Sequence, residues 1–193
     1  MITLENICKS YQNQPIFTNF NCTISEGVTT CILGPSGKGK TTLFRMLMEL
    51  EAPDSGTISG LDRLRKSVVF QEDRLCENLK IHANILLPHI KKESAITLTQ
   101  IDAALAELEL SGHENKLVCE LSGGMKRRVA ILRALFASYD ILFLDEPFKG
   151  LDDQTKEKTM DYFKKSTQGK TVLWITHDEG EVDYLKPENL LSL

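Results

Sequence analysis

A glycine-rich segment has the residue types that hold phosphate groups. It consists of Gly34, Pro35, Ser36, Gly37, Lys38, Gly39, Lys40, Thr41 and Thr42. It matches the pattern G-x-x-x-x-G-K-S/T in full. Glycines let successive backbone N–H groups approach phosphate oxygens, and a helix that starts at the end of the loop adds unpaired N–H groups and a favourable dipole. Lys40 would reach the β- and γ-phosphates of a nucleotide, and the Thr41 hydroxyl would bind Mg²⁺.

The neighbours of this segment decide between a phosphate site and a plain glycine turn. The apolar run CIL at 31–33 precedes it, and the helix-like run LFRMLMEL at 43–50 follows it. A strand that leads into a glycine loop and then a helix is the context that a phosphate loop requires. The pattern alone does not separate kinases, GTPases and ATPases.

Two adjacent acids stand at the end of another apolar run. The run ILFL at 141–144 is typical of a central parallel strand, and Asp145 and Glu146 follow it. Open parallel sheets place ligands at the carboxyl ends of their strands. Asp145 would therefore hold Mg²⁺ through water, and Glu146 would polarise an attacking water. Adjacent acids also end strands because they prefer solvent, but the phosphate loop in the same chain favours the chemical roles.

The run LSGGM at 121–125 is a second candidate anion site. Ser122, Gly123 and Gly124 offer a hydroxyl, two small residues and a helix N-terminus. The alternative is an ordinary N-cap with a loose turn. One chain with one nucleotide has no need of two phosphate-binding helix starts, whereas two facing chains would each supply one start to the other's nucleotide.

The elements that must position these residues form an α/β pattern. Strand-like runs at 2–7, 15–24 and 28–33 lie only a few residues apart, which predicts antiparallel hairpins. Later strands alternate with helices, which predicts a mostly parallel sheet. A short strand is expected at 57–60 and further strands at 67–71, 141–145, 170–176 and 189–193, with helices after the phosphate loop, from Ser122 and over about 153–166.

Two further features concern the helices. Between about 77 and 118 the pattern becomes helical, with Ile101, Leu105 and Leu108 at helical spacing, and this stretch is interpreted as a small helical insert. The basic run KRR at 126–128 is interpreted as a solvated or dimer-facing helix surface.

The whole chain, 1–193, is expected to form a single nucleotide-binding domain with an N-terminal antiparallel β subdomain.

Composition excludes several classes of protein. The 193 residues carry a formal net charge of −4, which argues against a general nucleic-acid binder because phosphate backbones demand a basic face. No stretch approaches the ~18 uncharged apolar residues of a membrane span, and no signal segment opens the chain. Five scattered cysteines without Cys-x-x-Cys spacing predict neither a disulfide framework nor a zinc site.

Five segments in this order resemble the ATP-binding cassette (ABC) ATPases, and the resemblance covers essentially the whole chain. They are GPSGKGKTT at 34–42, LSGGMKRRVAILRAL at 121–135, ILFLDEP at 141–147, KGLD at 149–152 and WITHD at 174–178. The resemblance implies a P-loop NTPase core, ATP and Mg²⁺ as cofactors, and ATP hydrolysis. It also implies a head-to-tail homodimer that sandwiches two ATP molecules.

The resemblance also implies a role for each matching residue. Tyr11 would stack on adenine, and the phosphate loop would hold the nucleotide together with Ser122, Gly123 and Gly124 of a second copy. Asp152 would lie in the loop that crosses the dimer interface. The implied metal ligands are Thr41, Gln71 and Asp145. The implied catalytic groups are Lys40, Gln71, Glu146 and His177, the last of which would hold the γ-phosphate.

The chain departs from the family pattern at two positions. Met125 stands where glutamine is commoner, which would remove a polar contact to the opposite nucleotide. Lys149 replaces a common small residue in the interface loop, which would change dimer coupling or add a charge near the phosphates. Neither departure removes a catalytic group, so hydrolysis is still expected.

The expected partner is a separate integral membrane permease, joined in an importer by a substrate-binding protein. The run FQEDRL at 70–75, with LSGGM and PFKGLD, is similar to the nitrate, sulfonate and taurine importer branch. The chain would then be cytoplasmic and peripheral on the inner face of the cell membrane. The alternatives are a soluble ABC ATPase acting on DNA or ribosomes, and an exporter motor. A small-molecule kinase would not explain LSGG and His177.

Overall fold

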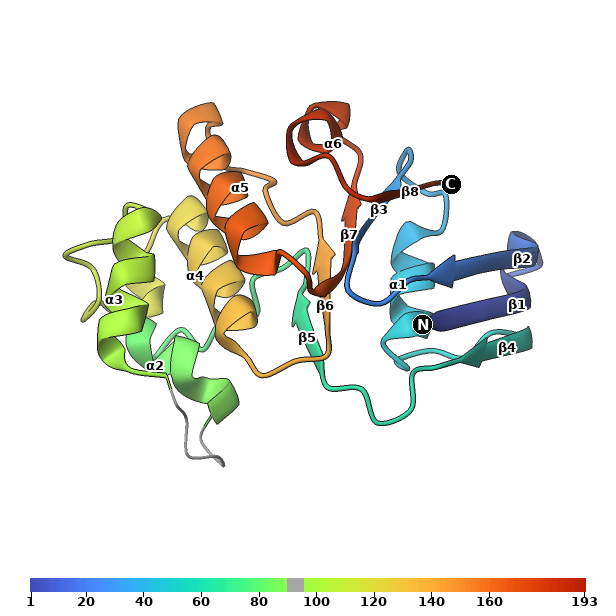
Figure 1. Ribbon diagram of the computed structural model, residues 1–193, viewed down its shortest axis with the longest axis horizontal. Coiled ribbons are helices and arrows are strands. Elements are labelled where there is room, and N and C mark those ends of the chain that lie inside the picture. The colour runs from blue at the N-terminus through green and yellow to red at the C-terminus, as the bar shows by residue number, and fades with distance from the viewer. Residues whose placement is uncertain (90–95) are drawn as a thin grey trace.

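The computed structural model describes residues 1–89 and 96–193 (Figure 1). One end of the molecule is a three-stranded antiparallel sheet. Its strands are β1 (Ile2–Tyr11), β2 (Gln14–Ile24) and β4 (Ser55–Ser59), in the order β2-β1-β4. The predicted antiparallel β subdomain and its first hairpin are therefore confirmed.

The third strand-like run does not continue this hairpin. It forms β3 (Thr29–Leu33), which pairs in parallel with two strands of the other sheet. Cys31 and Ile32 are fully buried, as expected for a strand covered on both faces, and Gly27 turns the chain between the sheets with a φ of 74°. The prediction that residues 28–33 belong to the antiparallel hairpins is wrong.

A five-stranded parallel sheet forms the centre of the molecule. Its order is β5 (Lys66–Val69), β6 (Ile141–Asp145), β7 (Thr171–Thr176), β3 and β8 (Asn189–Ser192). All four neighbouring pairs in this sheet are parallel. The carboxyl ends of β3, β6 and β7 therefore meet at one edge, where the phosphate loop, Glu146 and His177 follow them.

Helices cover both faces of the parallel sheet. Figure 1 shows α1 (Lys40–Leu47) between the two sheets. Its Leu43 and Phe44 join a core with Ile2, Leu4 and Phe143. The opposite face is covered by α4 (Gly123–Phe136), α5 (Asp153–Thr167) and α6 (Glu179–Leu185). These two layers confirm the predicted α/β class.

The predicted helical insert contains two short helices with a hydrophobic cluster of their own. They are α2 (Ile81–Leu86) and α3 (Leu98–Glu107), with 3-10 turns at Leu87–His89 and Val118–Glu120. The cluster packs Ile101 and Leu105 against Val129 of α4. Residues 90–95 of the stretch lie outside the described residues. Within the described ranges, no helix is both long and apolar enough to cross a membrane.

Candidate functional site

The phosphate loop joins the end of β3 to the start of α1. Gly39 sits in the left-handed region with a φ of 87°, and a Cβ at this position would lie 2.5 Å from Ile16 Cγ2. No side chain caps the start of α1, so its first N–H groups remain available to an anion. Lys40 is 7% exposed, and its Nζ donates to the backbone oxygens of Gly34 at 2.6 Å and Pro35 at 2.9 Å. The loop therefore curls around a buried ammonium group.

A cavity of about 330 Å³ lies over this loop. It brings together residues from five separate parts of the sequence, including most of the predicted nucleotide, metal and catalytic groups. Its lining consists of Tyr11, Ile16, Ser36, Gly37, Gly39, Lys40, Thr41, Thr42, Gln71, Asp145, Glu146 and Lys149. The exposed Lys38 does not line it, and Gly34 and Pro35 contribute carbonyl oxygens to Lys40 instead.

Glu146 is held from two sides at the end of β6. His177 Nδ1 lies 2.8 Å from its Oε1, and Lys149 Nζ lies 2.7 Å from its Oε2. Its backbone φ of 48° is uncommon for a residue other than glycine. Burial raises the pKa of this carboxyl, but the hydrogen bonds from Lys149 and His177 outweigh burial and leave the pKa lowered. Glu146 is therefore an ionised carboxylate at neutral pH.

Asp145 is the buried acid of the pair. Burial raises the pKa of its carboxyl, and the adjacent charge of Glu146 raises it further, while Arg127 and Lys40 act in the opposite direction. The Thr41 hydroxyl and the Gln71 amide line the same cavity. Carboxylate, hydroxyl and amide oxygens are the ligand types that Mg²⁺ accepts.

Tyr11 stands at the rim of the cavity, at the end of β1. It is 42% exposed, and its hydroxyl donates to Glu51 Oε1 at 2.5 Å. Lys9 Nζ lies 5.4 Å from the centroid of the ring. The ring is therefore anchored at its hydroxyl end, and stacking of Tyr11 on adenine stays a prediction.

His177 touches Glu146 but does not line this cavity, and neither do the four residues predicted to face a second copy. Ser122 caps α4 by accepting from the Met125 N–H at 3.3 Å, and Asp152 caps α5 by accepting from the Thr155 N–H at 3.1 Å. Gly123 and Gly124 open α4. Ser122, Gly123 and Asp152 are exposed in the single chain. Their predicted contact is with the nucleotide of another copy, which a single chain does not contain.

Arg127 holds the backbone around the acidic pair, a role that the sequence did not predict. It is 4% exposed and donates to the backbone oxygens of Phe70 at 2.6 Å, Asp145 at 2.8 Å, Glu146 at 2.6 Å and Pro147 at 2.8 Å. The interpretation of 126–128 as a solvated or dimer-facing surface is therefore wrong for this residue. Arg127 joins α4 to the ends of both β5 and β6.

A helical-spacing argument would have found Arg127. Arg127, Ile131 and Ala134 are related by steps of four and three residues, so they share one face of α4. All three are buried. An arginine on an apolar stripe must find acceptors inside the protein, since burying an unpaired charge is strongly unfavourable.

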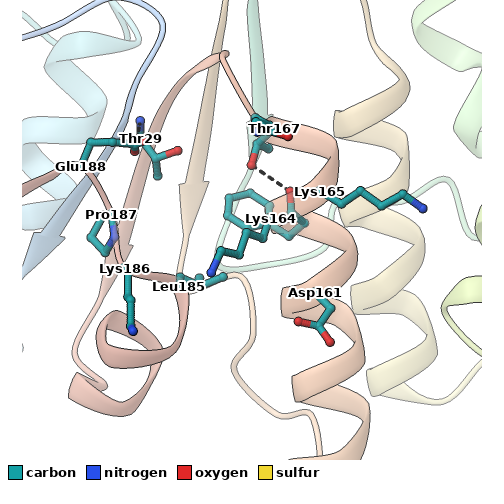
Figure 2. Close-up of a pocket in the computed structure, with 11 residues that line it drawn as sticks. Thr29, Asp161, Lys164, Lys165, Thr167, Leu185, Lys186, Pro187 and Glu188 are labelled. Atoms are coloured by element: carbon teal, nitrogen blue, oxygen red, sulfur yellow. Dashed lines mark hydrogen bonds between the residues drawn. The ribbon is translucent and has the colours of Figure 1, made fainter.

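A larger cavity, of about 420 Å³, lies between α5 and the segment after α6 (Figure 2). Asp161 and Lys164 of α5 line one side of it, and Lys186 lines another. The hydrogen bond drawn in Figure 2, from Thr167 to the backbone oxygen of Phe163 at 2.8 Å, lies within α5. None of the predicted site residues lines this cavity, so the candidate site is the smaller one over the phosphate loop.

Several known proteins are similar to this chain. It is 35% identical over 195 residues to the spermidine/putrescine import ATP-binding protein PotA of Acetivibrio thermocellus, covering 94% of this chain and 55% of PotA. It is 36% identical over 182 residues to the aliphatic sulfonates import ATP-binding protein SsuB 3 of Rhodococcus jostii, covering 93% of this chain and 66% of SsuB 3. The chain thus spans little more than half the length of PotA. It is 34% identical over 205 residues to the cell division ATP-binding protein FtsE of Mycobacterium tuberculosis, covering 96% of this chain and 89% of FtsE.

A solved structure and a family profile agree with these relatives. The dimeric ATP-binding cassette MJ0796, in a post-hydrolysis state bound to ADP and Pi, matches with a TM-score of 0.84 and 30% identity, covering 100% of this chain and 94% of that one. The profile described as ABC transporter matches residues 17–149, a segment that includes the phosphate loop, Gln71, Asp145, Glu146 and Lys149. The resemblance found in the sequence is confirmed, and the chain belongs to the ABC transporter family.

Proposed function

We propose that this chain binds and hydrolyses ATP as the motor subunit of an ABC transporter. The observation that carries the proposal is the single cavity shared by Lys40, Thr41, Asp145 and Glu146. It combines a phosphate cradle, a cation site and a base, which are the parts that phosphoryl transfer to water needs.

The phosphate loop would hold the triphosphate through its backbone N–H groups, with Lys40 leaving the carbonyls of Gly34 and Pro35 for the phosphate oxygens. Thr41, Gln71 and Asp145 would hold Mg²⁺, which supplies charge neutralisation between the phosphates. Among the described residues, no three side chains of His, Cys, Asp or Glu are grouped so that they could hold a metal ion by themselves. A magnesium ion here would therefore take its remaining ligands from phosphate and water, as this ion commonly does.

Glu146 would act as the general base for the attacking water. Its ionised carboxylate lines the cavity, and His177 contacts it at 2.8 Å. A base must be ionised and within hydrogen-bond reach of the proton it removes. His177 would hold the γ-phosphate, and Gln71 would contact both the metal and the water.

The functional unit we propose is a homodimer with two nucleotides at its interface. Ser122, Gly123 and Gly124 do not line the cavity of their own chain but form a helix start at which Ser122 and Gly123 are exposed, which suits a nucleotide held by the facing copy. Asp152 would cross between the copies. The dimeric form of the related cassette MJ0796 supports this arrangement.

The partner would be an integral membrane permease, and the direction of transport would be import. PotA and SsuB 3 are both named as import ATP-binding proteins, which favours an importer with a substrate-binding protein. The chain would work on the inner face of the cell membrane. An exporter motor, or a soluble ABC ATPase acting on DNA or ribosomes, is the alternative.

Affinity purification of the tagged chain from gently solubilised source-cell membranes tests this proposal. We expect mass spectrometry to find a multi-span permease, and with it a substrate-binding protein, while the purified chain hydrolyses ATP with Mg²⁺. Recovery only with ribosomal proteins or nucleic acid would contradict the transport role and leave the ATPase role. Failure to bind Mg-ATP would contradict both.

A further inference from the structure

Lys149 forms an ion pair with Glu146, and the roles proposed above give Lys149 no function. It lies three residues after Glu146, and its backbone N–H donates to the backbone oxygen of Glu146 at 3.2 Å in a tight turn. This turn brings Lys149 Nζ to within 2.7 Å of Glu146 Oε2. The Lys149 side chain is 54% exposed, whereas that of Glu146 is 12% exposed. The ammonium group therefore reaches in from solvent to a largely buried carboxylate.

The ion pair with Lys149 engages the carboxylate of Glu146, which is the group that must accept a proton from water. His177 lies against Glu146 Oε1, and Lys149 binds Oε2, so both carboxylate oxygens already have a partner. A base that accepts a proton from water needs a carboxylate oxygen directed at that water. Lys149 must therefore find another acceptor before Glu146 can act on water.

Lys149 also lies where such an anion would arrive. It lines the same cavity as Lys40 and Thr41, the residues placed for the distal phosphates. A lysine ammonium is a point charge on a flexible stem, so it can change acceptors without a change in the backbone. A terminal phosphate offers more acceptor oxygens and more negative charge than one carboxylate.

We propose that Lys149 is a second phosphate-binding cation beside Lys40. It pairs with Glu146 and passes to the terminal phosphate of a bound nucleoside triphosphate, which frees Glu146 for the water. The inference rests on the proposed function, because it requires the triphosphate to lie over the phosphate loop. It adds a ligand that distinguishes the triphosphate from the diphosphate, since only the former has the phosphate that Lys149 would contact.

Calorimetric titration of the Lys149→Ser variant with two nucleotides tests this assignment. The probes are ADP and the β,γ-imido analogue of ATP, both with Mg²⁺, so that hydrolysis does not intervene. Loss of a charge-assisted contact in a partly exposed position is expected to weaken binding of the triphosphate analogue about fivefold to tenfold and to leave ADP affinity within about twofold. Lys149→Arg, which keeps the charge, should restore most of the discrimination.

The matched control is Lys165→Ser, which removes the same charge from a surface pair between Lys165 of α5 and Glu107 of α3. It should change neither affinity. A double-mutant cycle with Glu146→Gln adds a second readout: the two substitutions should be non-additive for the triphosphate analogue, since Glu146 competes for the same ammonium group.

The outcomes separate this inference from the function beneath it. If wild-type protein binds both nucleotides and Lys149→Ser weakens them equally or not at all, Lys149 is not a terminal-phosphate ligand and the proposed function stands. If wild-type protein binds neither nucleotide, the proposed function and this inference both fail.

Discussion

Arg127 on α4 donates from Nη2 to the backbone oxygen of Glu146 at 2.6 Å. The helix that Ser122 caps is thereby joined directly to the residue proposed as the base. The same guanidinium reaches the backbone oxygen of Phe70, immediately before Gln71, at 2.6 Å. Displacement of α4 in either direction would therefore act on the Gln71 loop and on the acidic pair together.

Replacing this arginine by methionine should destabilise the fold. Arg127→Met keeps the length and apolar character of the stem but leaves several buried carbonyl oxygens without a donor. Buried unsatisfied groups cost about 1–3 kcal/mol each, so the free energy of unfolding should fall by about 3 kcal/mol in urea titrations. Lys126→Met is the control, because its pair with Glu77 is solvent-accessible and should contribute less than about 1 kcal/mol. Equal losses in both variants would contradict the bridging role.

Removing the charge of Glu146 should separate binding from hydrolysis. Glu146→Gln keeps the shape of the side chain and removes its capacity to accept a proton from water. We expect Mg-ATP to bind and to be hydrolysed at least about a hundredfold more slowly, since a positioned base contributes on the order of 10²–10⁴ in rate. The trapped nucleotide should stabilise a dimer in size-exclusion chromatography with light scattering. A monomer with unchanged hydrolysis would exclude Glu146 as the base.

Features of the structure that depend on adjacent residues could be predicted from the sequence, whereas those that depend on contacts between distant residues could not. The phosphate loop, the Ser122 cap and the β6 acids were all predictable, since each follows from a few adjacent residues. The pairing of β3 was not, because short connections favour a hairpin locally whereas burial on both faces draws the strand into the parallel sheet. The contacts of Arg127 with Phe70 and Glu146 also depend on tertiary packing.

The loop lysines offer a matched pair for nucleotide binding. Lys40 is buried against the loop carbonyls and lines the cavity, whereas Lys38 is exposed and does not. Lys40→Ala should therefore abolish measurable ATP binding in equilibrium dialysis, and Lys38→Ala should retain affinity within about threefold, because charges separated by solvent interact weakly. Similar losses in the two variants would show that net loop charge, and not the position of Lys40, governs binding.

The turn that carries His177 should contribute a pH-dependent part of stability. Lys156 Nζ bonds Asp178 Oδ2 at 2.5 Å, and this hydrogen bond lowers the pKa of the Asp178 carboxyl below its ordinary value of 3.8. Because the folded pKa is depressed, the stabilisation is complete above about pH 5 and is lost as pH falls below about 4. The difference in free energy of unfolding between wild type and Asp178→Asn should therefore shrink as pH falls below about 4. A difference independent of pH would show that the ion pair contributes nothing.

The ring of Tyr11, and not its hydroxyl, should matter for nucleotide affinity. Base–aromatic stacking contributes about 1–3 kcal/mol when tested by alanine substitution, so Tyr11→Ala should weaken ATP binding about tenfold. Tyr11→Phe keeps the ring and loses only the hydrogen bond to Glu51, so its affinity should stay within about twofold of wild type. The pair of variants separates stacking from anchoring: if Tyr11→Phe binds as weakly as Tyr11→Ala, the contact with Glu51 holds the rim of the site and the ring does not stack on adenine.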